Sequence, residues 1–188
     1  MLKNLLFSLL FVATTLNATI STKENVTKLY IATFNRAPDS TGLNYWVNCG
    51  LSLEDIAVSF FGQTETKTLY PDEFSNEDFV VTIYDNLFSR APDSGGMDFW
   101  IGELESGRVS RSMFILAVLN GASGDDAKYL NNKTVVGLSF VDAQRDDINE
   151  ANSIMDGVTR EPDSVYRVLC NYSLVECDGS NMIDAPLQ

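Results

Sequence analysis

Two stretches of the chain repeat each other, and this self-similarity constrains the fold more than any other feature. Residues 21–46 align with residues 75–100 without a gap. Each copy contains the run Arg-Ala-Pro-Asp-Ser and ends on an aromatic residue followed by Trp. After a slightly longer loop in the second copy, the likeness resumes at Ser52 and Ser110. One such unit is too small to bury its apolar face alone, so we expect the two copies to pack on each other.

Each copy is predicted to form three helices. Apolar residues recur at helical spacing ahead of each motif; they are Val26, Leu29, Tyr30 and Phe34 in the first copy and Val80, Ile83, Tyr84, Leu87 and Phe88 in the second. Pro38 and Pro92 should end this helix, because the residue before a proline avoids helical angles. Asp39 and Asp93 then stand at the N-cap position of a short second helix.

Serine and aspartate residues predict where the other helices begin. Ser21 with Glu24 has the spacing of a capping box, and Ser75 with Asp78 is a shorter version of it. A serine in front of an apolar helical face also predicts the start of each third helix. The remaining expected caps are Ser52, Ser110 and Asp147, the last with Glu150 as its capping-box partner.

The region after the repeats is expected to be helical as well. Apolar residues at helical spacing predict a helix over residues 126–142, and Pro162 fits the first turn of a last helix. Sustained alternation of apolar and polar residues, typical of strands, is absent from the sequence. The predicted fold is therefore all-α: a tandem repeat of two three-helix units plus C-terminal helices, packed as one compact domain.

The N-terminal residues have the pattern of a secretory signal peptide. Lys3 supplies the positive end, an apolar run follows, and small residues lead to a cleavage site after Ala18. The run is too short to span a bilayer, so we expect no membrane span after cleavage and a location outside the cytoplasm, either periplasmic, extracellular or at the cell surface. The expected organisation is residues 1–18 as signal peptide, 19–122 as tandem repeat (copies 21–65 and 75–122) and 123–188 as C-terminal helical segment.

Charge and composition exclude several classes of function. The formal net charge is −13, which argues against binding nucleic acid or anionic lipid. The sequence has no histidine, the commonest general base and transition-metal ligand. Outside the cytoplasm, Cys170 and Cys177 are expected to form a disulfide that closes a small loop. Cys49 would then remain a thiol, and the spacing of the three cysteines matches no zinc pattern.

The repeated motif, Arg-Ala-Pro-Asp-Ser-x-Gly followed by an aromatic residue and Trp, resembles a bacterial family catalogued as domain of unknown function 4214. The core of the resemblance covers residues 21–122. The resemblance implies a secreted or cell-surface protein, because members often lie beside calcium-binding repeats, surface-layer parts or adhesin-like regions. It implies no activity and no catalytic residues, and this chain lacks the glycine–aspartate repeats of those longer proteins.

The charged residues of the motif have two interpretations each. Arg36 and Arg90 are candidate binding residues for a carboxylate or a sugar, or else they bind last-turn carbonyls and a nearby Asp. Asp39 and Asp93 are candidate calcium ligands, but one carboxylate per copy falls short of the six to eight oxygens that calcium takes, so a capping role is favoured.

The aromatic residues of the motif are the remaining candidates. Tyr45, Trp46 and Trp100 are candidate binding residues, because exposed aromatic rings stack on sugars or anchor protein partners. Burial in the core is the favoured alternative for the two tryptophans.

Three functions are compatible with the sequence. The first is a non-catalytic interaction or assembly module that binds a surface protein or a glycan, with no cofactor. The second is a calcium-stabilised surface module. The third is a hydrolase that uses two carboxylates, although no pair among the many acidic residues stands out. The oligomeric state is not encoded in any pattern we recognise.

Overall fold

A computed structural model of the chain describes residues 21–71 and 73–177. These residues form helices and contain no strand, as the sequence predicts. In chain order the helices are α1 (Lys23–Phe34), α2 (Ser40–Asn48), α3 (Leu53–Phe61), α4 (Thr64–Leu69), α5 (Asn76–Phe88), α6 (Ser94–Glu105), α7 (Arg111–Gly121), α8 (Gly124–Asp142), α9 (Ile148–Ser153) and α10 (Pro162–Asn171). The expected signal peptide falls outside the described residues. None of the helices in the described part is long and apolar enough to cross a membrane.

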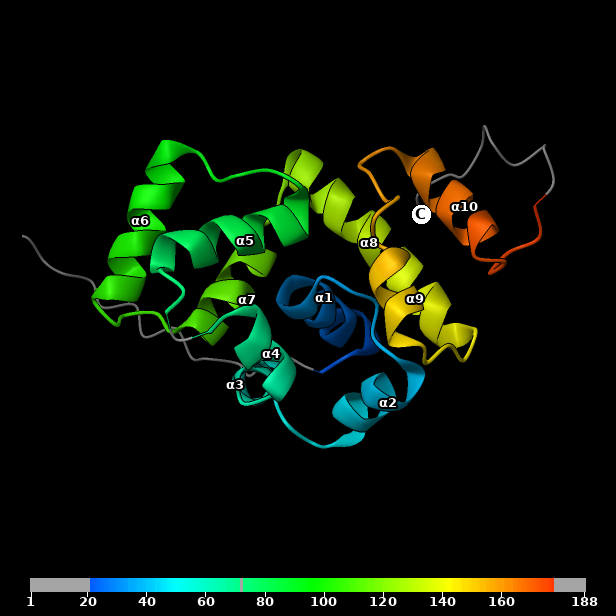
Figure 1. Cartoon of the computed structure of the whole chain (residues 1–188), viewed down its shortest axis with the longest axis horizontal. Helices are drawn as coiled ribbons and strands as arrows, with labels where there is room; N and C mark the ends of the chain where they lie inside the picture. The colour runs from blue at the N-terminus through cyan, green and yellow to red at the C-terminus, as the bar shows by residue number, and fades with distance from the viewer. Residues whose placement is uncertain (1–20, 72, 178–188) are drawn as a thin grey trace, which may run out of the picture.

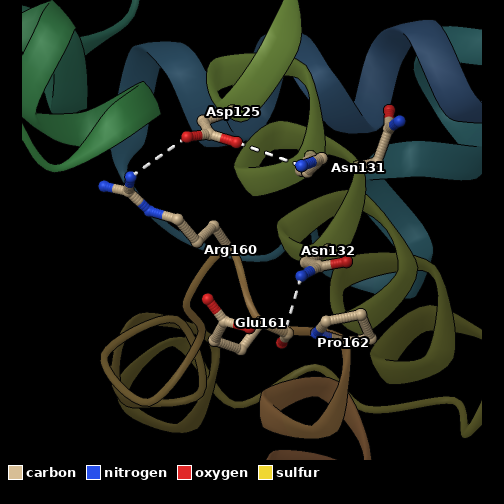
Figure 2. Close-up of a pocket in the computed structure, with 7 residues that line it drawn as sticks. Asp125, Asn131, Asn132, Arg160, Glu161 and Pro162 are labelled. Carbon is tan, nitrogen blue, oxygen red and sulfur yellow. Dashed lines mark hydrogen bonds and ion pairs between the residues drawn. The ribbon is translucent and has the colours of Figure 1, made fainter.

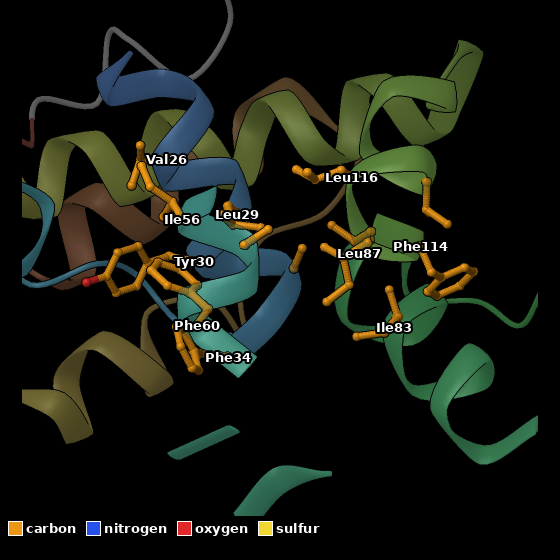
Figure 3. Close-up of a cluster of buried hydrophobic side chains, with 14 of the residues drawn as sticks. Val26, Leu29, Tyr30, Phe34, Ile56, Phe60, Ile83, Leu87, Phe114 and Leu116 are labelled. Carbon is orange, nitrogen blue, oxygen red and sulfur yellow. The ribbon is translucent and has the colours of Figure 1, made fainter. Parts of the chain in front are cut away.

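The two repeats place their corresponding helices as the sequence predicts. Helices α1, α2 and α3 correspond to α5, α6 and α7, and α1 lies at the centre of the molecule, in contact with α5, α7 and α8. The core joins both copies (Figure 3): Phe60 of the first copy and Phe114 of the second are almost completely buried within one cluster. The copies therefore share one core.

Local capping explains where most helices begin. The side chains of Asp39, Asp93, Ser52, Ser75 and Ser110 each accept a hydrogen bond from the backbone N–H three residues on. These are the predicted N-caps, and each satisfies one of the free donors in the first turn.

The prediction for the start of α1 was wrong by one residue. Thr22 is the N-cap, and its hydroxyl accepts a hydrogen bond from the N–H of Asn25 at 3.1 Å. The hydroxyl of Ser21 instead donates to the carbonyl of Leu51 at 2.6 Å. The carboxylate of Glu24 pairs with Lys28 one turn later on the helix. Serine is the better N-cap of the two by preference, but here Ser21 contacts Leu51 and Thr22 caps the helix.

The first helix of each copy ends before its proline, by a shared device. Asn35 and Ser89 adopt left-handed φ angles of 50° and 51°, and the N–H of each donates to the carbonyl four residues back. This left-handed residue turns the chain away from the helix axis. The proline then follows in an extended segment that leads to α2 or α6.

The C-terminal helices differ in extent from the prediction. Helix α8 begins at Gly124, two residues earlier than expected, and α9 ends at Ser153 although apolar spacing continues to Val158. Turns of the chain place Ile154, Met155 and Val158 in a second buried cluster with Ile31 and Ala37 of the first copy. The C-terminal segment thus covers the first copy, on the side of the molecule opposite α6 (Figure 1).

Lys133 lies in the middle of α8 and contacts the C-terminal end of the first helix of each copy, α1 and α5. Its Nζ donates to the side-chain oxygen of Asn35 at 3.2 Å and to the carbonyl of Asn86 at 2.6 Å. The side chain is buried, and burial lowers the pKa of Lys133 to about 8 despite Asp85 and Asp156 nearby. A cation at the end of α5 satisfies a last-turn carbonyl that lacks a helical partner.

We expect the free energy of unfolding to rise with pH between pH 8 and 9.5. In this window the folded Lys133 loses its proton, whereas in the unfolded chain, with a pKa of about 10.4, it keeps it. The increase should be at most about 1.5 kcal/mol by linkage. Urea unfolding at the two pH values measures it. The Lys133→Met variant should lose this pH dependence, and a wild-type slope that persists in the variant would disprove the assignment.

Candidate functional site

The motif arginines make the same contacts in both copies. Arg36 donates from Nε and Nη2 to the carboxylate of Glu65 at 2.8 and 3.0 Å, and from Nη1 to the carbonyl of Ala37 at 2.9 Å. Arg90 donates from Nε and Nη2 to the carboxylate of Asp126 and from Nη1 to the carbonyl of Ala91. We call these the first and second arginine–carboxylate pairs.

The carboxylates of these pairs come from the same place in each copy, although Glu65 lies at the end of the predicted first copy (21–65) and Asp126 lies beyond the predicted second (75–122). Glu65 lies in the first turn of α4, and Asp126 lies in the first turn of α8. Each carboxylate therefore lies on the helix that follows the third helix of its copy. The repeated unit thus contains four helices, α4 and the start of α8 being the fourth. The three predicted helices of each copy are present, and α4 is an additional helix of only six residues without a clear apolar face.

Burial distinguishes the two pairs. The side chain of Arg36 is 6% exposed, whereas that of Arg90 is 42% exposed. The ring contacts do not distinguish them, because Arg36 lies 5.2 and 5.3 Å from the ring centroids of Tyr30 and Phe34, and Arg90 lies over the equivalent rings of the second copy at 5.4 and 5.7 Å. The hydrogen bonds and the charge of Glu65 outweigh the effect of burial and raise the pKa of Arg36. Both arginines are engaged within the protein, which fits a structural role better than a free binding group.

Asp39 and Asp93 serve as helix caps. Their carboxylates accept hydrogen bonds from the N–H of Gly42 at 2.6 Å and of Gly96 at 2.8 Å. The close packing favours glycine at position 42, because a Cβ there would lie 2.6 Å from the hydroxyl of Tyr30, which would have to shift. Within the described residues, no three histidine, cysteine or acidic side chains gather in a way that could hold a metal ion. Calcium binding by Asp39 and Asp93 stays a prediction.

The aromatic residues of the motif divide into a packed ring and an exposed ring. Trp46 packs edge-on against Phe60 at 5.2 Å between ring centroids, and Trp100 against Phe114 at 4.9 Å. The rings beside them face solvent: Tyr45 is 63% exposed and Phe99 is 56% exposed. Tyr45 with Trp46 is the first aromatic pair, and Phe99 with Trp100 is the second. Within each pair the rings meet at a steep angle, at centroid distances of 5.0 and 4.9 Å.

The surroundings of the first aromatic pair include a shallow cleft. Its volume is about 280 Å³, and Trp46, Arg36, Gln63 and Glu65 are among the residues that line it. Aromatic, guanidinium, amide and carboxylate groups thus lie side by side along the cleft, with the guanidinium of Arg36 already bonded to Glu65. This chemistry suits a polar ligand with an apolar face better than a purely apolar one.

A second cleft, of about 460 Å³, lies between the start of α8 and the segment before α10 (Figure 2). Asp125 lies at its rim and pairs with Lys128 at 3.1 Å and Arg160 at 3.4 Å. The amide of Asn132 donates to the carbonyls of Thr159 and Glu161. Lys128 and Arg160 at this cleft are therefore both paired with Asp125.

The three cysteines fall into a disulfide near the C-terminus and a single thiol beside the first aromatic pair. Cys170 and Cys177 form a disulfide that closes a short loop after α10, with Cα atoms 5.5 Å apart. Cys49 is a partly buried free thiol whose Sγ donates to the carbonyl of Trp46 at 3.0 Å.

Comparison with known families supports the likeness seen in the motifs. The family model described as domain of unknown function (DUF4214) matches residues 2–53 and 57–123. The chain belongs to the DUF4214 family. Comparison with curated proteins and with solved structures gives no match. Because the DUF4214 family has no known function, membership assigns no activity to this protein. Its function must be argued from its surface.

Proposed function

We propose that this protein is a secreted or cell-surface, non-catalytic interaction module that binds a surface polysaccharide through its two aromatic pairs. The observation that supports the proposal is the exposure of Tyr45 and Phe99 at equivalent positions of the repeat. An exposed aromatic ring gains free energy when a sugar ring or another flat apolar face covers it. Since Trp46 packs edge-on against Tyr45 and Trp100 against Phe99, the exposed rings are already held in place. Stacking therefore requires little reorganisation of the protein.

Repetition favours a polymer over a globular protein as the ligand. Helices α2 and α6 lie at separate edges of the molecule (Figure 1), so the two aromatic pairs do not form one continuous patch. A polysaccharide presents the same unit many times and can contact two separated, similar sites at once. Two weak sites on one chain then combine into a higher overall affinity.

The hydrolase alternative is less well supported. A general acid at neutral pH needs a carboxyl whose pKa is raised. The carboxyl groups with shifted pKa values in the described part are Glu103, Asp125 and Asp146, and each is shifted downward by a hydrogen-bonding or ionic partner. These shifts favour the ionised form and suit salt bridges and helix caps.

Loss of the exposed rings is expected to weaken glycan binding. A glycan array identifies a polysaccharide probe, and the fluorescence of Trp46 and Trp100 then reports binding, since each lies beside an exposed ring. We expect Tyr45→Ala and Phe99→Ala each to weaken binding by about fivefold to tenfold, and the double variant to lose the avidity gain as well. Urea unfolding should show little change in these variants.

A matched control is available on α3. Val58 is 56% exposed and belongs to neither aromatic pair, so Val58→Ala should leave binding unchanged. Equal effects at Val58, Tyr45 and Phe99 would contradict the proposal, as would an array without a single bound glycan. Binding that survives in the double variant would place the glycan elsewhere on the surface.

A further inference from the structure

The loop between the motif arginine and the second helix is covered in the first copy and open in the second. Ala37 and Ser40 are buried, whereas their counterparts Ala91 and Ser94 are exposed. The sequence of this loop is the same in both copies, Arg-Ala-Pro-Asp-Ser. The difference in exposure therefore arises from what packs on the loop.

In the first copy, the segment Arg145–Ala151 covers the loop. The carboxylate of Asp146 accepts hydrogen bonds from the N–H and the hydroxyl of Ser40, at 2.8 and 2.7 Å. The carbonyl of Ala151 accepts from the N–H of Ala37 at 2.9 Å. The hydrogen bonds from Ser40, from its hydroxyl first, lower the pKa of Asp146. In the first copy, this loop thus binds an acidic segment of the same chain.

In the second copy, the same donors remain available. Within the described part of the chain, the N–H groups of Ala91 and Ser94 have no protein acceptor. Ser94 is the first residue of α6, a helix of twelve residues whose N-terminus favours negative charge. Arg90 adds a partly exposed guanidinium beside this loop. The N–H of Ala91 and the N–H and hydroxyl of Ser94 therefore match the donors of the occupied loop, while Arg90 is already bonded to Asp126 and contributes its charge.

We propose that the open loop Arg90–Ser94 is a docking site for an acidic segment of a partner protein, held as Arg145–Ala151 is held on the first copy. The partner would place an Asp or Glu carboxylate on the N–H and hydroxyl of Ser94 and a carbonyl on the N–H of Ala91. The proposal is independent of glycan binding by the aromatic pairs.

The proposed contact at Arg90–Ser94 would be a reversible docking contact, because the second copy lacks the apolar residue that anchors the C-terminal segment on the first. Ile31, which is buried beneath the C-terminal segment in the first copy, is replaced by the exposed Asp85 in the second. The apolar contacts that make the first contact permanent are thus reduced. Polar contacts dominate what remains, which favours reversible binding that weakens at high salt.

The probe is a synthetic peptide of residues 143–158, which contains Asp146 and Ala151. It is titrated into the isotope-labelled protein, and amide chemical shifts are followed by NMR. We expect saturable shifts at Ala91, Ser94 and Gly95. The peptide with Asp146→Asn should bind about tenfold more weakly or worse, because the hydrogen bonds would no longer be made to a charged group.

The substitution Ser94→Pro is the decisive variant. Proline is favoured at the first position of a helix, and Asp93, with φ −70° and ψ 166°, already has the extended conformation that precedes a proline. Helix α6 should therefore stay folded while the N–H donor is lost, and peptide binding should fall about tenfold or more. In contrast, Ser40→Pro should lower the melting temperature by several degrees, since its N–H is already used.

Three results would overturn the proposal. The first is the absence of saturable shifts at millimolar peptide. The second is equal shifts with sodium acetate at the same concentration, which would mean that any carboxylate suffices. The third is unchanged binding in a folded Ser94→Pro protein.

Discussion

Replacing Phe60 by alanine is expected to lower the free energy of unfolding by about 3–5 kcal/mol, the largest effect of any single change that we foresee. Phe60 is 1% exposed, and its ring contacts Tyr30, Phe34 and Trp46 at centroid distances of 4.9, 5.0 and 5.2 Å. Truncation removes all three ring contacts and leaves a cavity between α1, α2 and α3. Urea unfolding followed by circular dichroism measures the loss.

The position of Phe60 makes this prediction specific. The cavity would also remove the support for the first aromatic pair, so the fluorescence of Trp46 should shift along with stability. Val58→Ala, on the same helix but exposed, should change the free energy of unfolding by less than about 0.5 kcal/mol. A loss at Phe60 of less than about 1 kcal/mol would mean that the core does not join α3 to α1 as described.

The two arginine–carboxylate pairs should differ sharply when they are broken. Arg36→Ala is expected to cost about 2–4 kcal/mol, because the variant leaves Glu65 unpaired and removes a buried guanidinium from two aromatic rings. Arg90→Ala is expected to cost about 1 kcal/mol or less, because the exposed pair with Asp126 is hydrated and screened. Urea unfolding of both variants, at low and at high salt, tests the difference.

Salt provides the second criterion for this comparison. The contribution of Arg90 should shrink as salt is added, whereas that of Arg36 should change little, since buried pairs are screened less. Equal losses at the two positions would contradict the assignment of the first pair as buried. A loss at Arg90 that exceeds the loss at Arg36 would show that α8 depends on its pair more than α4 does.

The sequence predicts features that depend on neighbouring residues. Asp39, Asp93 and Ser75 could be predicted as caps, because a cap and the N–H it binds are three residues apart. The N-cap of α1, predicted at Ser21 and found at Thr22, shows the limit of this approach. The contact of Ser21 with Leu51 spans 30 residues, and no local pattern encodes it.

Partners that come from distant segments could not be predicted. The sequence predicts that Arg36 and Arg90 have acidic partners nearby, but the principal ones are Glu65 and Asp126, which lie 29 and 36 residues further on. A longer α7 shifts the alignment between the copies, so these carboxylates do not align in the sequence. For the aromatic residues the sequence favours burial of Trp46, and the structure adds its partner: Trp46 packs on Phe60, whereas Tyr45 is 63% exposed.

Helix α8 belongs to both repeats, and this sets how the protein can be divided. Its first turn supplies Asp126 to the second copy, while Val136 and Phe140, further along, bury Ile31 of the first copy. A cut between the copies would therefore strip the first copy of the residues that cover Ile31 and Ala37, while Asp126 would stay with the second. The segment that is duplicated in the sequence is thus different from the segment that folds as a unit. Adding or losing a single copy would require a new way to cover Ile31 and Ala37.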